Sequence, residues 1–303
     1  MINFIRSQFQ ATSTKRVLKR LGFALNTKLL IVHADDMGLS HSSNMACVQA
    51  MESGFVNSGS VMMPCPFANE MIAYAKLNPS KDIGIHLTLT SEWNGYKWPP
   101  LIGNKVPSLI NSNGFFFESR EELEMRASLS EVEQEMRAQI ELALSKGMNP
   151  THLDCHMFSG IVNPEFLKIY IKLGREYGMP VLLNRAKIKK WFRYDVDPYV
   201  TEQEVMVSRL FIATPRLVKK GFPNYYRHVL QSLSPGLNCL LVHPAFDDKE
   251  MKLITKGSTD YNSAWRQADF DFFTSDECRS IIHKSGIHLI TWKQIKEIYY
   301  NQS

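Results

Sequence analysis

Short apolar runs alternate with amphipathic stretches along most of this chain. Short runs, most of them apolar, predict seven strands at residues 29–32, 59–63, 82–89, 151–154, 181–183, 237–242 and 288–291. Apolar residues three or four apart predict helices at residues 40–53, 67–77, 130–146, 164–176, 274–284 and 293–300. Strands that alternate with helices are typical of parallel βαβ units. We therefore expect an α/β fold, a TIM-like (βα) barrel, complete or incomplete, of about seven strands.

The length and the charge distribution bound the domain organisation. A chain of 303 residues and 34.8 kDa fits one α/β barrel. Six of the 35 Lys and Arg lie before residue 29, whereas all 30 Asp and Glu lie after it. The net charge of +5 therefore belongs to a basic arm, residues 1–27, and the remaining single domain, residues 28–303, is nearly balanced. We expect no nucleic-acid partner; strongly salt-dependent binding through the arm would show otherwise.

The arm also carries an apolar stripe. Val17, Leu18, Leu21 and Leu25 recur at helical spacing between its basic residues. This spacing predicts an amphipathic helix, and docking on a partner subunit of a homodimer would cover its apolar face. No window has an apolar run long enough for a signal-peptide core or a membrane span, so we expect no membrane partner. The five cysteines, odd in number and without a CxxC pair, favour a reduced, cytoplasmic setting.

The segment KLLIVHADDMGL, residues 28–39, brings two adjacent carboxylates to the end of the first predicted strand. Asp35 and Asp36 would repel each other in a core unless a positive group held them. Neighbouring residues of a strand point in different directions, so one carboxylate can bind a metal ion while the other faces a substrate as a base. A helix N-cap is the alternative interpretation, because Asp is favoured at that position.

Three further strands carry titratable residues at the same end. Active groups of a parallel barrel lie at the C-terminal ends of the strands or in the loops that follow. The residues concerned are His86 in GIHLTL, His152, Asp154 and His156 in THLDCHM, and His243 before Pro244. Each has an alternative when taken alone. His86 could be a hydrogen-bonded core histidine, the THLDCHM residues could form a polar strand edge, and His243 could serve only the turn before Pro244.

Taken together, these residues supply the donors of a metal site. One carboxylate and two histidines can hold one divalent ion, magnesium or zinc, and leave positions open for catalysis. Such an ion polarises a carbonyl and lowers the pKa of a bound water, while a carboxylate accepts the water's proton and a histidine protonates the leaving group. In THLDCHM, alternation places His152, Asp154 and His156 on one side, where Asp154 could orient a ligand ring.

The motifs also resemble those of a known family. HADDMGLS, GIHLTLT, THLDCHM, HPAF and the tail from Ala264 to Ile295 are similar, in the same order, to the YdjC-type carbohydrate deacetylases, which include chitooligosaccharide deacetylase. The resemblance begins near Lys28 and covers nearly the whole chain except the arm. It implies a similar barrel, a bound divalent metal, and removal of N-acetyl groups from amino sugars.

Carried over by motif, the resemblance implies a role for each of five residues. It implies Asp36, His86 and His156 as metal ligands, Asp35 as the general base and His243 as the acid. Many relatives continue the motif with histidines two and four residues after His156, where this chain has Phe158 and Gly160. The ligand set is complete if His156 binds the metal, and His152 is the alternative ligand. The absence of the two further histidines bears on which sugar the protein accepts.

Aromatic residues in the long segment 91–117 offer a substrate wall. Trp93, Tyr96 and Trp98 can pack against the apolar faces of sugar rings, or they can pack the loop onto the barrel. Arg185, after the fifth predicted strand, can steady an oxyanion or form a surface salt bridge. The remaining histidines, which fit no cluster and are interpreted as structural, are His33, His41, His228, His283 and His288.

These observations predict a metal-dependent amide hydrolase. Metal-bound water would attack the amide carbonyl of an N-acetylated amino sugar or oligosaccharide, which is the expected partner. Two alternatives stay open: another metal-dependent hydrolase, such as a phosphoesterase, and a non-catalytic sugar-binding protein. Few basic residues flank the motifs, which argues against a phosphate substrate.

Overall fold

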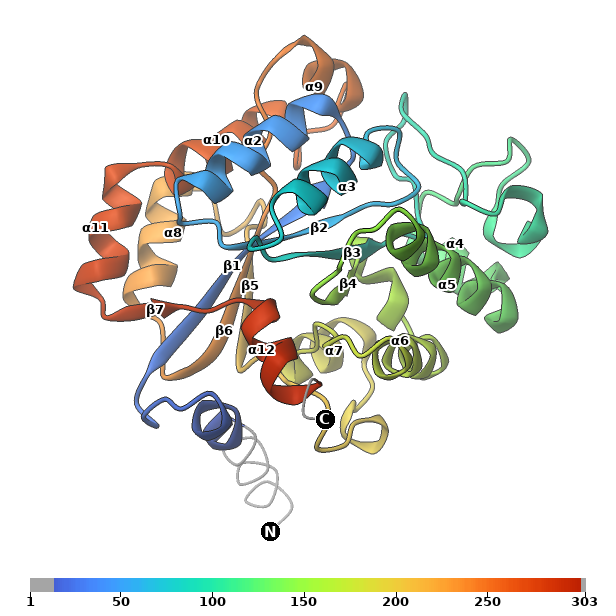
Figure 1. Cartoon of the computed structure of the whole chain (residues 1–303). Coiled ribbons are helices and arrows are strands. Elements are labelled where there is room, and N and C mark those ends of the chain that lie inside the picture. Colours follow the sequence, from blue (N-terminus) through green and yellow to red (C-terminus); the bar gives the residue numbers. More distant parts are fainter. Residues whose placement is uncertain (1–13, 301–303) are drawn as a thin grey trace.

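The computed structural model describes residues 14–300, which form seven strands surrounded by helices (Figure 1). The strands are β1 (Lys28–Met37), β2 (Ser58–Val61), β3 (Ile83–Leu87), β4 (Leu153–Cys155), β5 (Arg209–Ile212), β6 (Gly236–Val242) and β7 (Ile287–Leu289). The helices are α2 (His41–Glu52), α3 (Ala68–Leu77), α4 (Arg120–Arg126), α5 (Leu129–Ser145), α6 (Pro164–Glu176), α7 (Arg185–Phe192), α8 (Phe222–Gln231), α9 (Lys249–Ile254), α10 (Ser263–Phe273), α11 (Asp276–Lys284) and α12 (Trp292–Tyr299). Residues 14–20 are also helical.

The strands form one parallel sheet, which confirms the predicted α/β class. Its order is β4-β3-β2-β1-β6-β5, and β7 pairs with the first residues of β1. Beyond β4, single parallel bridges join Leu153 to Val181 and Leu183 to Met206, which leads toward β5. The arrangement is a half-barrel, consistent with the predicted incomplete barrel.

One apolar cluster lies on the outer face of the sheet, and a second lies on its inner face. On β1, Leu30 and Val32 belong to the large cluster beneath the helices. Leu29 and Ile31 belong to a second cluster with the alternate residues of β6, as strand alternation requires. The sheet is therefore packed on both faces, as buried parallel strands demand.

The N-terminal helix packs within the same chain. Val17 and Leu18 are buried in the second cluster against Leu29 and Ile31, so residues 14–20 cover the inner apolar layer where β1 begins. The predicted amphipathic helix thus exists, but its apolar face needs no partner subunit to cover it. Leu25, predicted on the same stripe, is 45% exposed. The first 13 residues of the predicted arm lie outside the described part of the chain.

The fifth predicted strand is the main error in the fold prediction. Residues 181–183 make only isolated bridges, and β5 instead follows the segment 184–208 that has no clear pattern. The strand reads RLFI, and its short apolar run after the exposed Arg209 was overlooked next to the irregular segment. Helices α4, α7, α8, α9 and α10 were also not predicted.

Two composition-based expectations can be compared with the structure. All five cysteines are buried free thiols, as the absence of a disulfide framework predicted. Within residues 14–300, no helix combines the length and apolar character needed to cross a membrane.

Candidate metal centre

An irregularity near the end of β1 turns both adjacent carboxylates toward one cavity. The pairing with β2 shifts between Ala34 and Met37, and Asp36 has a φ of 63°. This left-handed conformation is uncommon for a residue other than glycine. In a regular strand Asp35 and Asp36 would point to opposite faces, whereas bulges redirect side chains and here both line the same cavity.

Asp36 meets two histidines, His86 on β3 and His156 directly after β4. Its Oδ1 atom lies 3.1 Å from His156 Nδ1 and 3.4 Å from His86 Nε2, and all three side chains are buried. Donor atoms about 2.1 Å from a common ion lie roughly 3.0–3.4 Å apart. The three donors therefore have the chemistry and the spacing of a divalent-metal site.

The second nitrogen of each histidine is held by another carboxylate. His86 Nδ1 lies 2.8 Å from Asp154 Oδ2, and His156 Nε2 lies 2.9 Å from Glu92 Oε2. Such partners fix the ring orientation of metal-binding histidines. Although burial disfavours the charged ring, Glu92 and Asp36 raise the pKa of His156 to about 9. A bound metal ion would therefore displace protons from the site.

Arg266, on α10, completes the surroundings of Asp36. Its Nη2 donates to Asp36 Oδ2 at 2.8 Å, its Nε donates to the Tyr261 carbonyl at 2.9 Å, and its guanidinium lies over the Trp93 ring. Burial opposes ionisation of Asp36, but Arg266 and His156 hold its carboxyl pKa well below the ordinary value. Sequence reasoning missed Arg266, which lies in the tail of the family resemblance without a spacing that marks it.

Asp35 lies between two other histidines. Its Oδ2 atom is 3.6 Å from His243 Nε2, and its Oδ1 atom is 3.2 Å from His33 Nε2. Burial raises the pKa of Asp35 to about 7, although His86 opposes this shift. Burial also lowers the pKa of His243 to about 3, so this ring is neutral near pH 7. The His243 backbone N–H donates to Asp269 Oδ2 at 2.8 Å, which fixes the turn after β6.

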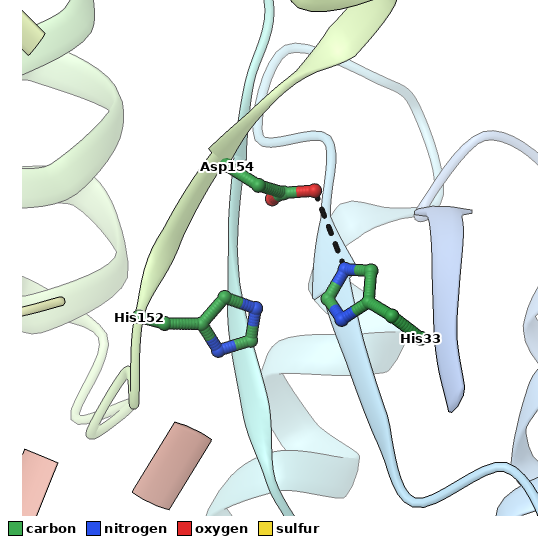
Figure 2. A group of neighbouring side chains, drawn as sticks. All are labelled: His33, His152 and Asp154. Carbon is green, nitrogen blue, oxygen red and sulfur yellow. Dashed lines mark ion pairs between the residues drawn. The ribbon is translucent and has the colours of Figure 1, made fainter. Parts of the chain in front are cut away.

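A deeper polar group includes a residue that the sequence interpretation left out. His33, His152 and Asp154 come together beneath the Asp36 cluster, with donor atoms within 4.8 Å of one another (Figure 2). The interpretation of His33 as a structural residue outside any cluster is wrong, because its Nε2 pairs with Asp154 Oδ2 at 3.3 Å. His152 stacks on Trp292 and contacts Thr151 Oγ1 at 2.9 Å, away from the Asp36 donors.

The cavity above these groups has a volume of about 760 Å³, and only part of the predicted aromatic wall lines it. Trp93 reaches the cavity. Trp98 is fully buried, donates from Nε1 to the Thr90 carbonyl, and packs edge-on against His156. Phe158 and Trp191, whose rings lie 4.8 Å apart, also line the cavity and were not predicted.

The basic residues that line the cavity differ from the one predicted from the sequence. Arg185 forms an ion pair with Asp197 and is not among the cavity-lining residues, so the salt-bridge alternative describes its position. Arg120, Lys190 and Lys256 do line the cavity. These three residues lie outside the sequence motifs. For this reason few basic residues were found next to the motifs in the sequence.

The parallel half-barrel and the buried Asp–His–His cluster above its inner layer define a class of protein, an α/β barrel-like protein with a candidate metal centre. A model of the YdjC-like protein family matches residues 29–284, and this chain belongs to that family. It is 30% identical to a carbohydrate deacetylase of Thermus thermophilus over 94% of this chain and 99% of the relative. It is 28% identical to a carbohydrate deacetylase of Brevibacillus brevis over 88% and 99%, respectively.

A solved structure has the same fold. It is an Enterococcus faecalis V583 protein described as a cellobiose-phosphate cleavage protein, with a TM-score of 0.72 and 23% identity. The match covers 89% of this chain and 99% of that chain.

Proposed function

We propose that the protein is a metal-dependent deacetylase that removes the N-acetyl group of an amino sugar or oligosaccharide. The observation that carries this proposal is the buried Asp36, His86 and His156 set at the cavity floor, beside the carboxylate of Asp35. The carbohydrate deacetylases of Thermus thermophilus and Brevibacillus brevis support the substrate class. The reaction would add water to the acetyl carbonyl carbon, break the C–N bond, and release acetate and a free amine.

Asp36, His86 and His156 would hold one zinc or magnesium ion. When bound, a divalent ion polarises a carbonyl and makes a nearby water more acidic. The chain's own contribution is to fix the donors: Arg266 occupies one oxygen of Asp36, Asp154 orients His86, and Glu92 orients His156. This support leaves one face of the set toward the cavity.

Asp35 would accept the proton of the attacking water. Its carboxyl pKa of about 7 places it near the operating pH, where a base combines availability with strength. His243 would then carry this proton from Asp35 to the leaving amine, because its Nε2 atom is 3.6 Å from Asp35 Oδ2. Since burial keeps His243 neutral before the reaction, Asp35 is the proton source that the geometry offers.

The cavity walls suit a sugar ring. Trp93 stands on one part of the lining, and Phe158 with Trp191 forms another. Aromatic faces can pack on the apolar faces of a sugar, while polar groups fix its orientation. Among the cavity-lining residues, Asn94, Ser258 and Asp260 offer such polar groups.

A phosphoesterase is the second candidate, and the cavity's basic residues favour it. Arg120, Lys190 and Lys256 supply positive charge that phosphate groups require. The same residues could instead attract an acidic group elsewhere on an acetylated sugar. Phosphate release from phosphorylated sugars, measured beside acetate release, separates the two activities.

Two substitutions test the assigned roles. Asp36→Ala removes a donor and should abolish binding of zinc or magnesium together with turnover. Asp35→Asn should keep the metal and lower the rate by about 10²–10⁴-fold, because the base is lost while the donors remain. Calorimetric metal titration and acetate release report the two quantities separately. A near-normal rate for Asp35→Asn would show that another group is the base.

A further inference from the structure

The polar layer beneath the proposed metal centre contains a buried histidine to which the proposed function gives no role. His33 is fully buried, and its Nε2 atom faces two carboxylates, Asp35 Oδ1 at 3.2 Å and Asp154 Oδ2 at 3.3 Å. Figure 2 shows the ring directed toward Asp154 rather than away from it. His33 therefore links the proposed base to the carboxylate that orients the ligand His86.

Hydroxyl groups from β2 occupy the remaining positions around the ring. His33 Nδ1 lies 2.9 Å from Ser58 Oγ, and Nε2 lies 3.1 Å from Ser60 Oγ. Both ring nitrogens thus face oxygen atoms that accept hydrogen bonds. A doubly protonated ring donates at both nitrogens, whereas with a ring protonated only at Nε2 the Ser58 hydroxyl has to donate to Nδ1.

The second histidine of the polar layer, His152, has no carboxylate that favours a positive charge as strongly as those beside His33. His152 is held at Nδ1 by Thr151, and its ring packs edge-on against His33 at 4.9 Å. Burial and the neighbouring His33 keep the pKa of the His152 ring well below its ordinary value. Although burial opposes it, Asp154 and Asp35 raise the pKa of His33. Of the two rings, His33 is the one beside which the carboxylates favour a positive charge.

The charge balance of the whole site agrees with a positive His33. The carboxylates that pair with the proposed ligands, with Arg266 or with His33 are Asp35, Asp36, Asp154 and Glu92. Arg266 and a divalent ion would together supply three positive charges against these four carboxylates. Buried charges are tolerated when they are compensated, and a positive ring at His33 would lie where two of these carboxylates meet.

We propose that His33 is a positioning residue, a buried imidazolium that holds Asp35 and Asp154 together and keeps the Asp35 carboxylate directed at the cavity. This inference rests on the proposed function, because it takes Asp35 as the proton acceptor. A base that drifts by about 1 Å from its productive position can lose about a hundredfold in rate. His33 acts through Asp35 and does not touch the substrate.

The charge state can be measured directly on the intact, magnesium-loaded protein. With ¹⁵N-labelled histidine, the His33 resonances, assigned by their loss in His33→Gln, should show both ring nitrogens protonated at pH 7. A neutral ring would overturn the proposal. So would a metal-shifted ring nitrogen together with two magnesium or zinc ions per chain, because His33 would then be a ligand of a second ion.

The positioning role is tested by a double-substitution cycle. His33→Gln keeps hydrogen-bonding groups but removes the charge, and it should lower kcat by about 10–100-fold while KM and metal affinity change by less than about threefold. In an Asp35→Asn background the same substitution should have no further effect. An equal loss in both backgrounds would show a merely structural role and overturn the proposal.

Controls separate this inference from the proposed function. His41→Gln removes a histidine that pairs with Glu70 on the surface, outside the cavity lining, and should leave kcat unchanged. If His33→Gln does not fold, triple-resonance assignment of the unsubstituted protein identifies the His33 ring, and its resonances still decide the charge state. If the unsubstituted protein releases no acetate from any substrate, the proposed function fails, whereas the protonation of His33 is still decided by its spectrum.

Discussion

Replacing Arg266 with Met removes the buried cation that pairs with Asp36. The two side chains are 2% and 4% exposed, and their atoms lie 2.8 Å apart. Breaking a buried pair by deleting one partner costs about 3–5 kcal/mol, because the other charge is left uncompensated in a medium of low dielectric. We therefore expect Arg266→Met to lower the free energy of unfolding by about this amount when a chelator keeps metal away.

Metal should reverse part of this loss. If Asp36 holds a divalent ion as proposed, that ion would supply the positive partner that the variant lacks, so its binding should stabilise Arg266→Met more than the unsubstituted protein. Urea unfolding in chelator and in saturating zinc or magnesium measures both free energies. The difference in the free energy of unfolding between Arg266→Met and the unsubstituted protein should be smaller when the metal is present.

Two results would refute this reasoning. A loss below about 1 kcal/mol in chelator would mean that Arg266 does not compensate Asp36. A difference that stays the same with and without metal would mean that Asp36 does not bind the ion. Arg126→Met is the matched control, because this exposed arginine pairs with Glu122 on the surface of α4 and should change stability by less than about 1 kcal/mol.

Two further predictions concern stability. Leu18→Ala creates a cavity beneath the sheet and should lower the free energy of unfolding in urea by about 2–5 kcal/mol. Leu25→Ala, on a 45% exposed side chain, should lower it by less than about 0.5 kcal/mol. Equal losses would contradict the packing described for residues 14–20. Burial raises the pKa of Asp269 to about 6 from 3.8, so its contribution to stability is complete below pH 3.8 and is lost as the pH rises through about 6. Asp269→Asn should therefore show a shallower fall in stability across this window than the unsubstituted protein, and an identical slope would contradict the assigned pKa.

The strands that could be predicted from the sequence are those with a clear apolar run. The first and sixth strands consist largely of Val, Ile, Leu and other apolar residues. β6 agrees with its predicted limits to within one residue, and β1 begins one residue before the predicted start but continues to Met37, five residues beyond the predicted end. β5 has only the three apolar residues Leu210 to Ile212 after an exposed arginine, and its pairing with β6 could not be read from this short run.

The candidate site shows the same division. Polar groups gather at the C-terminal ends of parallel strands, and this rule predicts that Asp35, Asp36, His86, His243 and the polar residues of THLDCHM lie together. The choice of Asp36, His86 and His156 among them came from the family resemblance. His33 could have been found by the same reasoning, since it lies two residues before Asp35 and alternation puts both on one side. The bulge that turns Asp36 and the approach of Arg266 depend on contacts between distant segments, which no local spacing reveals.

Acetate release tests the central claim most directly. The chelated protein would be given N-acetylated mono- and oligosaccharides, with and without added zinc or magnesium, and acetate would be quantified together with the free amine. The proposed function predicts release of both products in equal amounts from at least one substrate, only when metal is present. Binding of a metal ion without acetate release from any acetylated sugar would contradict it.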